Sequence, residues 1–183
     1  RIVKAKKPEV IFLENVENLV RHDDGNTLRV ILDTLEGLGY DVHYQVLNAA
    51  HYGVAQIRRR IYFVCFRKDL PAEFSFPEPT FKDVAVEDFL LPAVDEKYYL
   101  DPGLFTIYKP DTFIRQLDTY RMGYIGTPGQ GRHLYSIKGC SPTFVVSARG
   151  PCGSTEAYYI NRRMRRLTPY EAKRILGFPD DFV

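Results

Sequence analysis

The chain has 183 residues, of which 45% are hydrophobic and 26% charged, with a formal net charge of +2. These values are close to globular averages, so we expect a packed core. Three irregularly spaced cysteines exclude a disulfide framework and a zinc or other metal site, and no apolar run is long enough to span a membrane.

The first 70 or so residues alternate between strand-like and helix-like patterns. Residues 9–15 (EVIFLEN) form a short apolar run that is typical of a buried strand. The turn HDDGN follows, and Asn26 or Thr27 is expected to cap the next helix. Within residues 27–39, leucine and isoleucine recur on one helical face, and Gly39 is expected to end the helix.

Two further strands follow at residues 40–49 and 59–67. The connection of about ten residues is too short for a crossover helix, so we expect these strands to pair antiparallel. The whole predicts a β-α-β unit that ends in a hairpin, as one side of an open α/β sheet.

The character of the chain changes near residue 71, where a Pro-rich and aromatic stretch begins. Short β-prone pieces follow at residues 97–100, 144–148 and 156–160, among recurring Gly and Pro. We therefore predict one domain over residues 1–74 and a smaller β-rich domain over residues 75–183.

The last clear element is a helix over residues 168–176, TPYEAKRIL. Thr168 and Glu171 have the spacing of a capping box, and Pro169 suits the first helical position. Gly177 is expected to end this helix.

Charge is unevenly distributed. Residues 71–101 hold eight acidic residues and two lysines, whereas residues 112–174 hold eleven Lys and Arg and three acidic residues. A basic segment that is also aromatic and Gly-rich favours a phosphate backbone as partner. A solvated basic surface is the alternative, which composition does not exclude.

Three local patterns carry the candidate chemistry. ENV places Glu14 at the carboxyl end of a strand, where open α/β sheets bind ligands. In QIRRR, strand alternation predicts that Gln56, Arg58 and Arg60 share one face, with Arg59 opposite. The third pattern is RRLTPYEAKRILGFP. Each alone has an ordinary alternative: a chance tripeptide, a charged edge strand, or a capped surface helix.

In this order and spacing, the three patterns resemble the C5-cytosine DNA methyltransferases, and the resemblance covers nearly the whole chain. It implies part of an open Rossmann-like methyltransferase sheet plus a small target-recognition domain. It also implies methyl transfer from S-adenosylmethionine to C5 of a cytosine flipped out of duplex DNA. Relatives that act on tRNA share much of this chemistry, so RNA stays open, but a G-Q-G sequence at residues 129–131 favours DNA.

The resemblance implies roles for the pattern residues. In the family a cysteine thiolate attacks C6, and a carboxyl group that bridges N3 and the exocyclic amine neutralises the charge that develops; here that group is Glu14. Arg60 and Arg58 match the arginines that face the cytosine carbonyl oxygen. Gln56, like Thr168, Glu171 and Arg174, is expected to support the structure.

The segment YIGTPGQGRHLYSIKG is similar to the family's target-recognition region. Gln130, between two glycines, is our candidate for entering the stack that the base vacates. The sequence does not show which further residues contact bases and which contact phosphates. The candidates for both are Arg132, His133, Lys138, Thr143 and Arg149.

The family's nucleophile belongs to a Pro-Cys motif before ENV, and none precedes Glu14 here. Pro151-Cys152 lies instead in the variable region, so we interpret Cys152 as a loop residue. The glycine-rich cofactor loop is also absent, so most of the S-adenosylmethionine pocket is expected outside this sequence. We expect a fragment, inactive alone, of a bacterial restriction-modification enzyme in the cytoplasm, associated with the nucleoid. One subunit of a split methyltransferase, or a non-catalytic DNA-recognition module, is the alternative.

Overall fold

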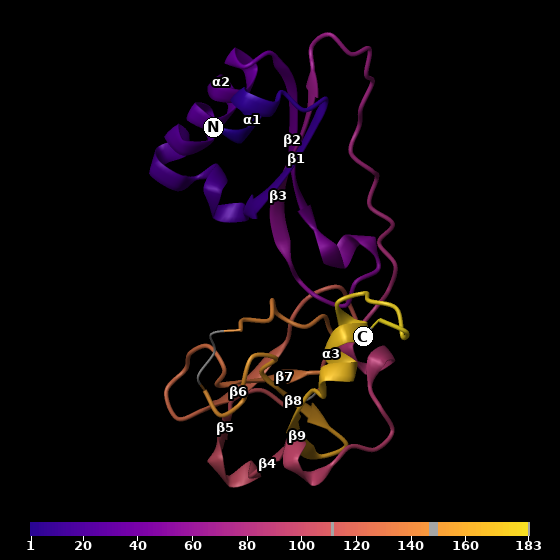
Figure 1. Ribbon diagram of the computed structural model, residues 1–183. Helices are drawn as coiled ribbons and strands as arrows, with labels where there is room; N and C mark the ends of the chain where they lie inside the picture. The colour runs from indigo at the N-terminus through magenta and orange to yellow at the C-terminus, as the bar shows by residue number, and fades with distance from the viewer. Residues whose placement is uncertain (111, 147–149, 183) are drawn as a thin grey trace. The chain divides into compact units, whose positions relative to one another are not determined.

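The structure is a computed structural model that describes residues 1–110, 112–146 and 150–182. The chain divides into two compact units (Figure 1). The first comprises Arg1–Asn48 and Arg59–Glu78, and the second comprises Ala49–Arg58 and Pro79–Val183. Residues 49–58 thus belong to the second unit, although they lie between two strands of the first. The domain boundary predicted after residue 74 stays a prediction.

The first unit is a three-stranded antiparallel sheet with two α-helices. Its strands, in the order β1-β3-β2, are β1 (Val10–Val16), β2 (Tyr40–Asn48) and β3 (Arg59–Arg67). Its helices are α1 (Ile2–Lys6) and α2 (Asn26–Gly37), with 3-10 turns η1 (Glu17–Val20) and η2 (His22–Gly25) between β1 and α2. The predicted antiparallel pairing of residues 40–49 with 59–67 is confirmed, from Tyr40 opposite Arg67 to Asn48 opposite Arg59.

Helix α2 packs its apolar face on the sheet, as its spacing predicts. Leu28 and Leu35 join a buried cluster with Ile61 and Phe63 of β3. Burying an aliphatic side chain of this size contributes about 1.5–3 kcal/mol, so this face holds the unit together. The predicted cap was wrong: Asn26 is the first helical residue, and the N-cap is Gly25 at φ +85°, a conformation that glycine adopts without strain.

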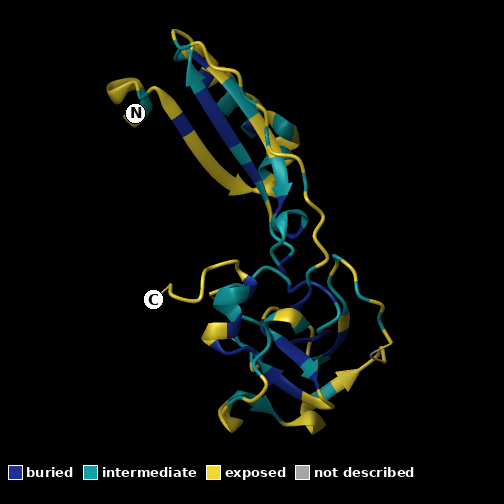
Figure 2. Cartoon of the chain, turned by 90° about the vertical axis from the view of Figure 1, so that its right-hand side faces the viewer, coloured by how far each residue is buried: buried dark blue, intermediate teal, exposed yellow. Residues whose placement is uncertain are grey.

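Strand β1 is not the buried strand that its apolar composition predicted. Only Ile11 is buried, whereas Phe12 is 66% exposed and Leu13 39% exposed. Figure 2 shows β1 as largely exposed, in contrast to the buried residues of β3. The reason is that β1 is an edge strand of this sheet, and α2 covers only one face of it.

The second unit is built on a six-stranded sheet in the order β4-β9-β8-β7-β6-β5. Neighbouring strands are antiparallel except β7 and β8, which are parallel. The strands are β4 (Tyr99–Leu100), β5 (Phe105–Ile107), β6 (Arg121–Ile125), β7 (His133–Ser136), β8 (Ala157–Ile160) and β9 (Arg163–Arg166). The other elements are α3 (Pro169–Ile175) and the 3-10 turns η3 (Ala49–Tyr52), η4 (Val86–Phe89), η5 (Glu96–Tyr98) and η6 (Pro102–Leu104).

The predicted strands of this unit are confirmed at residues 99–100 and 157–160. The strand predicted at residues 144–148 was wrong for residues 144–146, which are irregular, and the rest of it lies outside the described residues. Helix α3 has the predicted ends, with Thr168 as N-cap and Gly177 at φ +83° after its last turn.

Candidate functional site

A glutamate and an arginine form an ion pair at one end of the first unit's sheet. Glu14 of β1 lies opposite Tyr62 of β3, so Arg60, two residues earlier, is its diagonal neighbour. The Glu14 Oε1 atom lies 2.9 Å from Nε of Arg60. The Glu14 side chain is 39% exposed and that of Arg60 17% exposed. A hydrogen-bond acceptor and a donor fork therefore lie side by side and partly open, an arrangement that can bind a polar ring edge.

Arg59 points to a different partner, as alternation predicts. Its Nη1 atom lies 3.5 Å from Oε1 of Glu17, and both side chains are about half exposed. Strand β3 is the central strand of the sheet, so the alternative of a charged edge strand is wrong. Strand β3 begins at Arg59, so Gln56 and Arg58 precede it. The prediction that these two residues share a strand face with Arg60 was therefore wrong.

Gln56 is buried within the second unit beside Ser141. Its Nε2 atom donates to Ser141 Oγ at 3.4 Å, and the two residues form a parallel β-bridge. The amide of Ile57 donates to the Ser141 carbonyl, and the amide of Ser141 donates to the Ala55 carbonyl, both at 2.8 Å. These contacts fit the supporting role expected for Gln56. Q-x-R-x-R thus divides between the units, with Gln56 and Arg58 in the second and Arg60 in the first.

Thr143 also contacts the segment that contains Gln56, and this contact is structural. Its hydroxyl donates to the carbonyl oxygen of Ile57 at 2.8 Å, so it secures the segment that carries Gln56 and Arg58. Lys138 has a partner too: its Nζ lies 2.6 Å from Oε2 of Glu87. Arg149, which was also predicted to contact DNA, lies outside the described residues.

The G-Q-G loop is held by a glutamate that sequence reasoning missed. Glu156 accepts the amide of Gly131 at 2.8 Å and the amide of His133 at 2.7 Å. Gln130 is exposed and directly precedes the first of these two amides, and Arg132, between them, is half-buried. His133 is buried, with its Nδ1 3.5 Å from Glu156, a placement that argues against contact with a base. No motif in the sequence singled out Glu156, because an isolated carboxylate carries no spacing signal.

A buried ion pair organises the base of helix α3. Arg165 Nη2 and Nη1 donate to Glu171 Oε1 and Oε2 at 2.7 and 2.9 Å, and the two side chains are 2% and 0% exposed. Glu171 also accepts the amides of Thr168 and Leu91, both at 2.8 Å. Burial raises the pKa of this carboxyl group, but the hydrogen bonds from Arg165 and the two amides outweigh it, so its pKa is lowered.

The predicted capping box of Thr168 and Glu171 is therefore present, but it lies in the core and not on the surface. Arg174 is half-buried and donates to the Phe89 carbonyl at 3.4 Å, which ties α3 to η4. Arg115, which no motif indicated, forms ion pairs with Asp83, Glu87 and Asp88. These contacts fit a structural role for the third motif.

The three cysteines are free and buried. Burial raises the pKa of Cys65 and Cys140 to about 11 and that of Cys152 to about 12. All three are therefore thiols at neutral pH, whereas nucleophilic attack needs a thiolate. Cys152 lies in a turn of the second unit, and its amide donates to the Gly131 carbonyl at 2.8 Å. The loop position predicted for Cys152 is confirmed.

Neither a membrane-spanning helix nor a metal-binding cluster occurs in the described part of the chain. None of its helices combines the length and the apolar character needed to cross a membrane. Its His, Cys, Asp and Glu side chains form no group of three or more that could hold a metal ion.

Comparison with known proteins connects this geometry to a family. The family profile "C-5 cytosine-specific DNA methylase" matches residues 1–183. The chain is 40% identical over 184 residues to the Type II methyltransferase M.HhaI of Haemophilus parahaemolyticus, covering 100% of the chain and 56% of the relative. It is 38% identical over 189 residues to M.SsoII of Shigella sonnei, covering 100% of the chain and 47% of the relative. The chain thus spans about half the length of these relatives.

Solved structures agree on the fold. A methyltransferase of Entamoeba histolytica, EhMeth, superposes with a TM-score of 0.62 at 19% identity, over 96% of the chain and 52% of that structure. DNMT2 of Spodoptera frugiperda gives a TM-score of 0.64 at 15% identity, over 96% of the chain and 57% of that structure. The predicted fold class, part of an open Rossmann-like sheet with a β-rich domain, is confirmed.

Proposed function

Because the chain belongs to the C-5 cytosine-specific DNA methylase family, we propose that it forms the middle and target-recognition parts of an enzyme that methylates C5 of cytosine in duplex DNA. The observation that carries this proposal is the ion pair of Glu14 and Arg60, 2.9 Å apart and partly exposed at the sheet end. Open α/β sheets bind ligands at the carboxyl ends of their strands, and Glu14 lies near that end of β1.

The two side chains bind different groups of the flipped base. The Glu14 carboxyl group binds N3 and the exocyclic amine, where charge develops when a thiolate adds to C6. The guanidinium of Arg60 binds the carbonyl oxygen through N–H groups that are always charged. Once C5 carries the methyl group, loss of the C5 proton lets the cysteine leave C6. The ion pair between Glu14 and Arg60 keeps these donors and acceptors oriented before the base arrives.

The cofactor would be S-adenosylmethionine, which supplies the methyl group when bound. The open carboxyl end of β1 fits one wall of such a pocket. The sequence holds no glycine-rich loop of the kind that would cradle it, so most of its pocket would come from another part of the enzyme. Either a longer polypeptide or a complementary subunit can provide that part, together with the nucleophilic cysteine.

The DNA contacts proposed for the second unit centre on the G-Q-G loop. Gln130 is exposed, and Glu156 holds the backbone that directly follows it, so this side chain can reach a base stack from an anchored segment. Arg132 and Lys138 would contact phosphates or bases, and Lys138 would exchange Glu87 for that contact. Thr143 and His133 are occupied by internal contacts and fit support better than base readout. In a bacterium this enzyme would act on the nucleoid, in the cytoplasm.

Methyl transfer from labelled S-adenosylmethionine to duplex DNA tests the proposal at two levels. The longer enzyme that contains these residues should transfer methyl groups to cytosine, whereas the 183-residue chain alone should not. Turnover by the 183-residue chain would contradict the assignment of the nucleophile elsewhere. Absence of turnover in the longer enzyme would contradict the proposed activity. The sequence upstream of Arg1 then separates the two possible arrangements: an in-frame Pro-Cys motif indicates one polypeptide, and a start codon indicates a separate subunit.

A further inference from the structure

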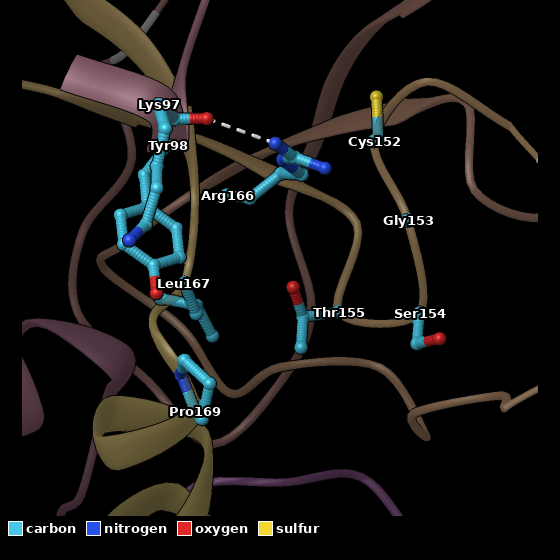
Figure 3. A pocket seen from close by; sticks show the side chains of 9 residues that line it. All are labelled: Lys97, Tyr98, Cys152, Gly153, Ser154, Thr155, Arg166, Leu167 and Pro169. Atoms are coloured by element: carbon cyan, nitrogen blue, oxygen red, sulfur yellow. Dashed lines mark hydrogen bonds between the residues drawn. The ribbon is translucent and has the colours of Figure 1, made fainter. Parts of the chain in front are cut away.

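A cavity of about 400 Å³ opens on the second unit, beside the turn that contains Cys152 (Figure 3). Two of the residues that line it, Lys97 and Arg166, are cationic, and none is a carboxylate. The cavity also presents the side chains of Tyr98, Ser154 and Thr155, which carry hydroxyl groups. Most of its exposed lining is apolar, so a phosphate-bearing ligand would depend on these few cationic and hydroxyl groups.

Arg166 differs from the other arginines of strand β9. Arg163 forms an ion pair with Glu96 at 2.7 Å, and Arg165 pairs with Glu171, also at 2.7 Å. For Arg166 the described part of the chain provides no carboxylate partner. Three arginines thus stand within four residues of one strand, and the cationic charge of Arg166 alone is left unneutralised.

The guanidinium of Arg166 is fixed in place but not satisfied. Its Nη2 atom donates to the carbonyl oxygen of Lys97 at 2.9 Å, the contact drawn in Figure 3. Its Nε atom is buried and has no hydrogen-bond partner within the described residues. A buried donor without a partner costs about 1–3 kcal/mol, and more when it is charged. Because the Nε atom is inaccessible, a ligand in the cavity would be bound through the Nη groups, for which the described residues supply no carboxylate.

The neighbouring thiol does not compete for that role. Cys152 is buried, which raises its pKa to about 12, so it carries no negative charge at neutral pH. Gly153 follows at φ +70°, which brings the backbone of the turn close to the Arg166 stem: a Cβ at Gly153 would lie 3.6 Å from Arg166 Cδ. The wall of the cavity is thus built around the arginine without offering it an anion.

We propose that this cavity binds a phosphate group through Arg166. Thr155 and Lys97 would be further donors and would exchange their long contacts to the Glu156 carbonyl (3.4 Å) and to Asp95 (3.5 Å) for the phosphate. Arginine suits this ligand because its planar fork donates two parallel hydrogen bonds to phosphate oxygens. The phosphate can belong to the backbone of DNA or to a free phosphate-bearing molecule. The inference does not depend on the proposed methyltransferase activity, because it rests on the contacts of Arg166 alone.

Titration of the ¹⁵N-arginine-labelled chain with inorganic phosphate, at constant ionic strength, tests the site by NMR. We expect a saturable shift of the Arg166 Nε–H signal, with a dissociation constant in the millimolar range. Arg166→Gln should abolish phosphate binding, measured independently by ³¹P line broadening. Arg163→Gln is the matched control, because it removes a cation of the same strand that already has a carboxylate partner, and it should bind phosphate as the unchanged chain does.

Two outcomes would overturn the proposal. One is a shift that does not saturate and that sodium chloride reproduces, which would show that phosphate does not bind specifically in the cavity. The other is phosphate binding that survives in Arg166→Gln. If that variant does not fold, Thr155→Val provides the test, because it keeps the guanidinium and should weaken phosphate binding about fivefold, the effect of one lost hydrogen bond. Unchanged affinity in Thr155→Val would then count against the site.

A competition arm identifies the source of the phosphate. A short duplex that suppresses the phosphate-induced shift would support the DNA backbone as occupant. Phosphate binding that is unaffected by saturating duplex would support a free phosphate-bearing ligand. Neither result needs methyl transfer, so failure of this proposal and failure of the proposed function are distinguishable.

Discussion

The chain contains two arginine–glutamate pairs of similar separation in opposite surroundings. In the first unit, Glu14 and Arg60 lie 2.9 Å apart and are 39% and 17% exposed. In the second, Glu171 and Arg165 lie 2.7 Å apart and are 0% and 2% exposed. The first pair lies at the open end of a sheet. The second accepts two further backbone amides within the core.

Because the two pairs differ in burial, we assign them different roles: a proposed site for the first and a structural support for the second. An exposed pair contributes little to stability, so its groups remain available to a ligand. A buried pair with its remaining hydrogen bonds satisfied cannot lose one partner without leaving a charge in the core. Mutations of the two glutamates should therefore have opposite signatures in activity and stability.

The largest effect is expected at Glu14. Glu14→Gln in the complete enzyme should lower the rate of methyl transfer by about 10²–10⁴, because the neutral amide cannot supply the acid–base function at N3. The unfolding midpoint should change little. Glu17→Gln is the control, since Glu17 also pairs with an arginine of β3 but lies 3.5 Å from it in an exposed position. A Glu14→Gln enzyme with unchanged turnover would remove Glu14 from its proposed role.

The next effect is expected at Glu171. Glu171→Gln should lower the free energy of unfolding by about 3–5 kcal/mol, because it leaves the Arg165 charge buried without its counter-ion. Chemical denaturation of the chain measures this directly. The matched control is Glu96→Gln, which removes the exposed carboxylate partner of Arg163 and should leave the midpoint nearly unchanged. Equal effects of the two substitutions would contradict the claim that burial makes the Glu171–Arg165 pair structural.

A smaller effect should appear with pH. Hydrogen bonds from Arg165 and two backbone amides hold the pKa of Glu171 below its ordinary value of 4.5 in the folded chain. Its contribution to stability is therefore fully present above about 4.5 and is lost as the pH falls through the lower folded-state value. The stability difference between the unchanged chain and Glu171→Gln should shrink as denaturation is repeated at decreasing pH below 4.5. A difference that stays constant over that range would show that the charge of Glu171 is not what stabilises the pair.

Much of the fold was predictable because it rests on local patterns. The spacing of leucines in α2 and the short connection between β2 and β3 specify those elements and their pairing without distant contacts. Thr168 and Glu171 likewise predict their helix start. The exposure of β1 was not predictable, because an apolar run indicates burial without showing which neighbour is present.

The candidate site was predictable in part. Motif order led to Glu14 and Arg60, which the structure brings together. It could not show that Gln56 and Thr143 turn inward, since these contacts join residues 85 or more positions apart. The roles of Glu156 and Arg115 also depend on long-range placement, for which a single carboxylate or arginine gives no signal in the sequence.

The central claim is that Glu14 serves a cysteine that is not among Cys65, Cys140 and Cys152. The most direct test is covalent trapping of the complete enzyme on duplex DNA that contains 5-fluorocytosine, with S-adenosylmethionine present. Fluorine at C5 blocks the proton loss that would release the thiol, so the cysteine–C6 bond persists and the attached peptide can be sequenced by mass spectrometry. The account predicts an adduct on a cysteine outside these 183 residues, and an adduct on Cys152 would contradict it.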